Sequence, residues 1–118
     1  MARTYEHLNV WKDSMDLIED VYRITSSFPK QELFGIVSQV RRSAVSITSN
    51  IAEGSGRSSK KDYCRFIDMA VGSLNETENI LRISLRLSYI TEKEFSTLND
   101  KILKIGNSLG AFRRYLKR

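Results

Sequence analysis

The chain is poor in the residues that disulfide-bonded, β-rich and catalytic proteins depend on. Its 118 residues include one cysteine, one proline, one histidine and six glycines. An all-β domain needs turn residues about every 8 to 12 positions, so the scarcity of Gly and Pro favours helices. The single Cys64 has no second cysteine with which to form an internal disulfide.

Targeting segments are also missing. Residues 1–11 lack the basic start and the apolar run of a secretory signal. No uncharged apolar stretch approaches the roughly 20 residues that cross a bilayer. We therefore predict a cytoplasmic protein that has no membrane partner.

The histidine count excludes two kinds of catalytic site. A carboxylate-bridged di-iron bundle needs a Glu-x-x-His motif on each of two helices, and the one histidine, His7, precedes the first predicted helix. A Ser or Cys nucleophile needs a base such as His, and no such arrangement surrounds Cys64. We expect no enzyme activity, no metal site and no cofactor.

Apolar residues make up 41% of the chain and recur at spacings of 3 and 4. In the first segment two adjoining rows do so: Leu8, Trp11, Met15, Ile18 and Tyr22, and Leu17, Val21, Ile24 and Phe28. Pro29 ends this pattern because it donates no amide hydrogen. A second helix is predicted to start near Lys30–Glu32 and to end at Gly54-Ser55-Gly56. Its core row is Leu33, Val37, Val40, Ala44, Ile47 and Ile51.

Two further helices begin at capping signals, Ser59 with Asp62 and Thr91 with Glu94. The core row of the third helix is Tyr63, Ile67, Ala70, Leu74, Thr77 and Leu81. The row of the fourth is Phe95, Leu98, Ile102, Ile105, Leu109, Phe112 and Leu116. Short connections make consecutive helices antiparallel neighbours. The sequence therefore predicts a single all-α domain over residues 1–118, an antiparallel up-and-down four-helix bundle.

A polar row of mostly small side chains runs opposite the core row of the second helix. It consists of Gln39, Ser43, Ser46, Asn50 and Glu53, with Arg42 beside it. A solvated helix face normally carries Lys, Glu and Arg, and small side chains let another helix come close. We predict that this row forms the interface of a homo-oligomer. The alternative is an ordinary surface of low helix propensity.

Several motifs are shared with a known family. They are Phe28-Pro29-x-x-Glu32, Ser38–Ile47 running into Ser49–Gly54, and Arg57-Ser58 followed by Phe66, Ala70 and Gly72–Glu78. With these motifs the chain resembles the bacterial four-helix-bundle family encoded within intervening sequences of 23S ribosomal RNA genes. The resemblance spans residues 5 to about 90, and the last helix matches only in its apolar pattern.

The resemblance implies an up-and-down bundle, a ring-shaped homopentamer and kinship to the accessory protein of diversity-generating retroelements, which binds nucleic acid and a reverse transcriptase. It assigns the matching polar and glycine positions to structure and assembly. These are Glu32, Gln39, Arg42, Ser43, Ser46, Asn50, Glu53, Gly54, Gly72, Ser73, Glu76 and Glu78. Thr77 departs from the family pattern, where Leu is usual, and is expected to weaken the core slightly.

Basic residues gather toward the carboxyl end of the chain. The net charge is +5, and residues 91–118 hold seven basic and three acidic residues. In an up-and-down bundle the chain start, the turn at residues 54–61 and the chain end share one pole. That pole would gather Arg3, Arg57, Lys60, Lys61, Arg113, Arg114, Lys117 and Arg118, opposed by Glu6, Glu53 and Asp62.

A basic pole of this kind binds phosphate backbones by counterion release, without sequence preference. Two plainer interpretations stay open. In one, Lys and Arg complement the dipole of the last helical turn. In the other, residues 54–61 are an ordinary connection between helices, since they lack the G-x-x-x-x-G-K-[ST] order of a Walker motif. Stacking on bases has little support from the other aromatic residues, because Trp11, Tyr22, Phe66 and Phe112 lie on core rows; the exceptions are Tyr63 and Tyr115 near the pole.

The resulting prediction is a non-enzymatic, ring-forming bundle that binds RNA or DNA through its pole. The contact residues predicted are Arg57, Lys60, Lys61, Arg113, Arg114, Lys117 and Arg118. One alternative is a scaffold for a protein partner such as the reverse transcriptase of a mobile element. Another is a structural protein of the intervening sequence.

Overall fold

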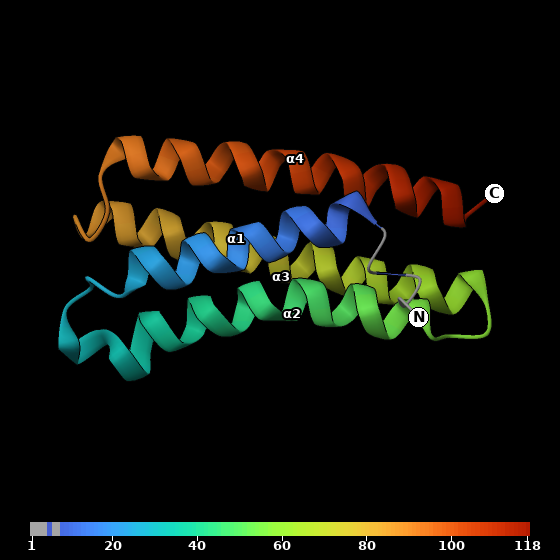
Figure 1. Cartoon of the computed structure of the whole chain (residues 1–118), viewed down its shortest axis with the longest axis horizontal. Helices are drawn as coiled ribbons and strands as arrows, with labels where there is room; N and C mark the ends of the chain where they lie inside the picture. The colour runs from blue at the N-terminus through green and yellow to red at the C-terminus, as the bar shows by residue number, and fades with distance from the viewer. Residues whose placement is uncertain (1–4, 6–7) are drawn as a thin grey trace.

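The chain folds into four antiparallel helices (Figure 1). The computed structural model describes residue 5 and residues 8–118. Helix α1 spans Asn9–Thr25, α2 spans Ser38–Ser55, α3 spans Lys60–Arg86 and α4 spans Glu92–Leu116. No strand occurs in the described residues. The prediction of an all-α, up-and-down four-helix bundle is confirmed.

Each helix packs against two others, α1 on α2 and α4, and α3 on the same two. The bundle measures 44 × 23 × 22 Å. Figure 1 shows the turn between α2 and α3 and the end of α4 at one end of the long axis, and the other two connections at the opposite end. Within the described part of the chain, no helix has the length and apolarity needed to cross a membrane.

The core draws fully buried side chains from all four helices. They include Leu17, Val21, Val40, Ala44, Ile47, Ile51, Ile67, Ala70, Leu81, Ile105 and Leu109. These residues belong to the apolar rows expected from the sequence. A smaller cluster of Phe28, Val37 and Ile90 closes the end that holds the α1–α2 and α3–α4 connections.

Of the two apolar rows of α1, the row that contains Leu17 and Val21 faces the core. The row that contains Trp11 and Tyr22 lies at the edge of the core. Leu17 and Val21 are fully buried, whereas Tyr22 is 43% exposed, so its prediction as part of the buried face is wrong. Arg41 of α2 contacts α1 beside Tyr22. Its Nε donates to Thr25 Oγ1 over 3.0 Å, and its guanidinium carbon lies 4.5 Å from the Tyr22 ring centroid. The Thr25 side of α1 therefore faces α2.

The segment before α2 is less regular than the sequence predicted. Lys30–Glu32 form a 3₁₀ turn, and Leu33–Val37 form a π-helical turn in which Gly35 has non-helical angles (φ −110°, ψ −112°). Leu33, predicted as a core residue, is 49% exposed, and Phe34 is 92% exposed. Glu32 is held here by a 2.8 Å hydrogen bond from the Tyr89 hydroxyl, a contact that the apolar pattern does not encode.

Both predicted capping signals start helices. The Thr91 hydroxyl accepts from the Glu94 amide (3.1 Å), and the Glu94 carboxylate accepts from the Thr91 amide (2.8 Å), which makes a complete capping box at α4. At α3 the Ser59 hydroxyl accepts from the Asp62 amide over 3.1 Å. The caps fix where α3 and α4 begin and so set the ends of the bundle.

Candidate nucleic-acid interface

The turn between α2 and α3 and the last turns of α4 build one end of the bundle (Figure 1). We call it the basic end, and define it by Arg57, Lys60, Lys61, Arg65, Arg113, Arg114, Lys117 and Arg118. Arg3 and Glu6, also expected at this pole, lie outside the described residues, as does His7.

Gly54 lets α2 and α3 meet closely at the basic end. A Cβ atom at Gly54 would lie 2.8 Å from both Phe66 Cβ and Tyr63 Cδ1. The chain then turns through hydrogen bonds from Gly56 N to Glu53 O (3.2 Å) and from Arg57 N to Gly54 O (3.0 Å). Gly54 therefore allows the two helices to pack closely. Its place in the Gly54-Ser55-Gly56 segment indicated only the end of a helix.

Two of the seven predicted contact residues have acidic partners. Arg57 pairs with Glu53 (3.3 Å) and with Asp62 (3.8 Å), and its guanidinium carbon lies 4.5 Å from the Phe66 ring centroid. The Arg113 Nε lies 2.5 Å from Asp68 Oδ1. Their charges are therefore offset within the protein.

The other five predicted contact residues keep an uncompensated charge. They are Lys60, Lys61, Arg114, Lys117 and Arg118, all exposed. None of them forms an ion pair within the described residues. The structure thus brings all seven predicted residues to one end and separates them into a paired set and an unpaired set.

An aromatic ladder crosses the basic end from the interior to the surface. The rings of Tyr63 and Phe112 meet edge to face (5.1 Å, 88°), and those of Phe112 and Tyr115 are stacked (6.1 Å, 18°). Burial raises the pKa of the Tyr63 hydroxyl. Tyr115 is 52% exposed, with Lys60 Nζ 5.3 Å from the centroid of its ring.

A hollow of about 400 Å³ lies between the start of α3 and the end of α4. Its lining is Lys61, Cys64, Arg65, Asp68, Leu116 and Lys117. Arg65 was not among the predicted contact residues, although its spacing of four from Lys61 places both on one side of a helix. Asp68 was not predicted either, because its pairing with Arg113 of α4 is not visible in the local sequence.

The polar row of α2 meets a helix of the same chain. Ser43 lies 2.8 Å from the Thr77 hydroxyl, and Ser46 lies 2.8 Å from the Ser73 hydroxyl, both on α3. Asn50 Nδ2 donates to Ser46 O over 2.9 Å. The small residues do admit a close helix, and within the monomer that helix is α3. Gln39, Arg42 and Glu53 remain exposed.

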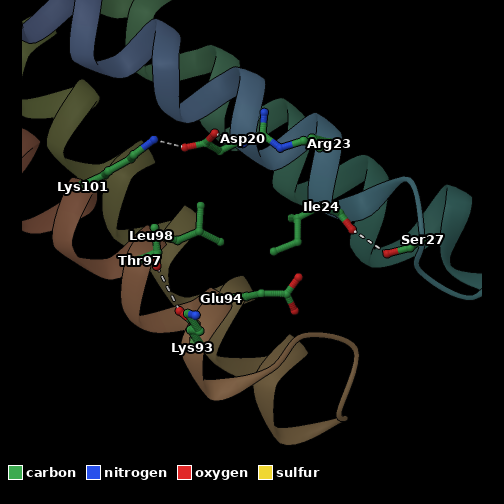
Figure 2. Close-up of a pocket in the computed structure, with 9 residues that line it drawn as sticks. All are labelled: Asp20, Arg23, Ile24, Ser27, Lys93, Glu94, Thr97, Leu98 and Lys101. Carbon is green, nitrogen blue, oxygen red and sulfur yellow. Dashed lines mark hydrogen bonds and ion pairs between the residues drawn. The ribbon is translucent and has the colours of Figure 1, made fainter.

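A second hollow, of about 420 Å³, lies between the end of α1 and the start of α4 (Figure 2). Its buried carboxylate, Asp20, pairs with Lys101 across the two helices and with Arg23 in its own helix. Glu94 belongs to the capping box of α4. The charged groups of this hollow therefore join and cap helices, at a distance from the basic end.

The described residues contain no cluster of three or more His, Cys, Asp or Glu side chains that could hold a metal ion. Cys64 is a free thiol and is buried beneath the hollow of the basic end.

Comparisons with known proteins agree with this architecture. The chain matches, over residues 6–111, the family described as 23S rRNA-intervening sequence protein. Among solved structures it is similar to a protein of unknown function of the S23 ribosomal protein family from Bacteroides thetaiotaomicron. The two are 26% identical, the alignment covers 88% of this chain and 97% of that chain, and the TM-score is 0.79.

Neither description names a catalytic activity. No curated protein matches the chain. The match covers nearly all of the bundle, and the crystal structure shares its helical fold. The chain therefore belongs to the family of 23S rRNA-intervening sequence proteins.

Proposed function

We propose that this protein is a non-enzymatic binder of RNA or DNA that holds phosphate groups at its basic end. The observation that carries the proposal is the set of cations without acidic partners among the described residues: Lys60, Lys61, Arg114, Lys117 and Arg118. They come from the start of α3 and the end of α4. A cation already paired with a carboxylate gains less from a phosphate than one that faces water.

The number of cations that bind phosphates sets how steeply the binding constant falls with salt concentration. Five neutralised phosphates give a slope of log K against log salt of about −4 to −5 on duplex DNA. Seven contacts, with Arg57 and Arg113 included, would give about −6. The slope therefore distinguishes the unpaired set from the full set predicted from the sequence.

Fluorescence anisotropy with labelled RNA and DNA, at about 50 and 200 mM salt, tests the proposal. A variant with Lys60, Lys61 and Lys117 changed to Glu should lose binding. Its matched control changes Lys30, Arg86 and Lys93 to Glu, which alters the net charge equally near the opposite end and should leave binding nearly intact. Absence of binding by the wild type at the lower salt concentration would refute the proposal, as would equal losses in the two variants.

We propose further that the chain forms a homo-oligomer through the outer side of α2 and α3, with the pentamer that the family resemblance implies. Gln39, Arg42, Ser46 and Glu76 line a shallow hollow of about 740 Å³ there. A ring would repeat the basic end on one face. Size-exclusion chromatography with light scattering measures the mass, and a strict monomer at micromolar concentration would end this proposal.

The second candidate function is a protein-interaction scaffold, and the exposed Phe34 favours it. Phe34 is 92% exposed and follows Leu33, which is 49% exposed, at the end opposite the basic end. We propose that a scaffold would present this apolar pair to a mobile-element protein such as a reverse transcriptase. Co-purification with a protein encoded beside this gene should then be lost in Phe34→Glu and kept in Leu103→Glu, a matched change at an exposed leucine of α4.

A further inference from the structure

The outermost ring of the aromatic ladder forms a supported platform on the surface of the basic end. Tyr115 is 52% exposed, and its ring is stacked on Phe112, with 6.1 Å between centroids and 18° between planes. Phe112 is held in turn by the edge-to-face contact with Tyr63. Phe112, itself held by Tyr63, therefore restricts the position of the Tyr115 ring.

One cation lies over this platform, and three more are close to it in the sequence. Lys60 Nζ lies 5.3 Å from the Tyr115 centroid, and Arg114, Lys117 and Arg118 lie within three residues of Tyr115 at the end of α4. None of these four has an acidic partner among the described residues. Aromatic rings among basic side chains are the combination that binds single strands, because bases stack on the rings while phosphates meet the cations.

We infer that the basic end takes unpaired nucleotides, with one base stacked on Tyr115 and the adjoining phosphates on Lys60, Arg114 and Lys117. The inference rests on the proposed nucleic-acid binding and names its substrate class. A duplex buries its base faces between neighbouring pairs, so it can use the cations of this end but not the ring. An unpaired strand can use both.

Lys60 lies over the ring in the free protein and does not block the site. Its side chain is exposed. A cation–π contact at an exposed position is weaker than the stacking of a base on an aromatic ring. The incoming base displaces the ammonium group, which stays within reach of the phosphate beside that base.

Three labelled probes of about 12 nucleotides separate stacking from charge: an oligothymidylate, an abasic strand with the same phosphates, and a duplex. The wild type should bind the oligothymidylate about 10-fold more tightly than the abasic strand. Tyr115→Leu should abolish that difference and leave duplex binding unchanged. Tyr115→Phe, which keeps the ring, should preserve it.

Tyr22 supplies the matched control. It is also an exposed tyrosine with a cation over its ring, since Arg41 lies 4.5 Å from its centroid, but it lies on α1 away from the basic end. Tyr22→Leu should leave binding of all three probes unchanged. Circular dichroism of each variant verifies that the bundle is folded.

The outcomes separate this inference from the proposed function. If the wild type binds the abasic strand as tightly as the oligothymidylate, the stacking site is refuted while charge-based binding stands. Equal losses on all three probes in Tyr115→Leu would refute it too. If the wild type binds no probe at about 50 mM salt, the proposed function fails and this inference falls with it.

Discussion

The hydroxyl of Tyr89 donates a 2.8 Å hydrogen bond to the carboxylate of Glu32, 57 residues earlier in the chain. The bond joins the α3–α4 connection to the 3₁₀ turn that precedes α2. The Tyr89 ring also packs on Phe28, with 5.3 Å between centroids. The two connections at the end opposite the basic end are thus fastened to each other.

This bond should make stability fall at alkaline pH. The hydrogen bond to Glu32, then burial and the charge of Glu32, raise the pKa of Tyr89 above its ordinary value. A raised folded-state pKa contributes stability that is complete below the unfolded pKa, about 10, and is lost as the pH rises through the folded pKa. Urea midpoints of the wild type should therefore drop above pH 10, more steeply than those of Tyr89→Phe.

Tyr63→Phe is the comparison for this measurement. The pKa of Tyr63 is raised by burial alone, so this variant should remove a separate part of the alkaline loss. If Tyr89→Phe keeps the full wild-type slope, the bond to Glu32 does not form in solution.

Thr77 should stabilise the bundle through its hydroxyl, although Leu is usual at this position in the family. Thr77 is fully buried, donates to Ser73 O over 2.8 Å and lies 2.8 Å from the Ser43 hydroxyl. Thr77→Val should cost about 1 kcal/mol of unfolding free energy, and Thr77→Leu about 1–3 kcal/mol because it also overfills the site. Urea denaturation measures both, and a stabilising Thr77→Leu would contradict this account.

Two glycine substitutions should have opposite effects. Gly54→Ala forces a Cβ to 2.8 Å from Phe66 and Tyr63 and should destabilise the protein by about 1–3 kcal/mol. Gly72→Ala, at an exposed position of α3 with no atom within 4 Å of the added carbon, should stabilise it by up to about 1 kcal/mol. Thermal denaturation compares the two, and a loss of stability in Gly72→Ala would mean that something else packs on that position.

Ser88 ends α3 in the left-handed region, with φ of 61°. A side chain there costs about 1–2 kcal/mol, which glycine avoids while losing more entropy on folding. Ser88→Gly should therefore raise the unfolding free energy by about 0.5–1 kcal/mol. The neighbouring Leu87→Gly is the control and should not stabilise the chain, because its φ of −86° suits any residue.

The core rows of the last three helices could be read almost completely from the sequence. Apolar spacings of 3 and 4 leave one face for a row such as Ile67, Ala70 and Leu81, and all three are fully buried. The first helix was ambiguous because it has two apolar rows, and only packing against the other helices shows that Leu17 and Val21 are the fully buried ones. Leu33 was misplaced because its apolar spacing continues through a turn that is not α-helical.

The sequence predicted which basic residues gather at the candidate site, but not all of their acidic partners. The up-and-down topology was enough to bring Arg57, Lys60 and Arg113 to one end, since alternate connections of such a bundle share an end. The pairing of Arg113 with Asp68 was not visible, because the two residues lie on different helices and meet only after folding. The support of Tyr115 by Phe112, in contrast, follows from their spacing of three on the predicted fourth helix.

By itself the sequence determined the number of helices, the caps of α3 and α4, most of the buried rows and the end at which the cations gather. Those features follow from local periodicity and short connections, which act over a few residues. The tertiary structure decided which cations stay unpaired, that the polar row of α2 meets α3, and how the ends are fastened. Those outcomes depend on side chains far apart in the chain, such as Ser43 with Thr77, 34 residues apart, and Asp20 with Lys101, 81 residues apart, which come within reach only when the helices pack.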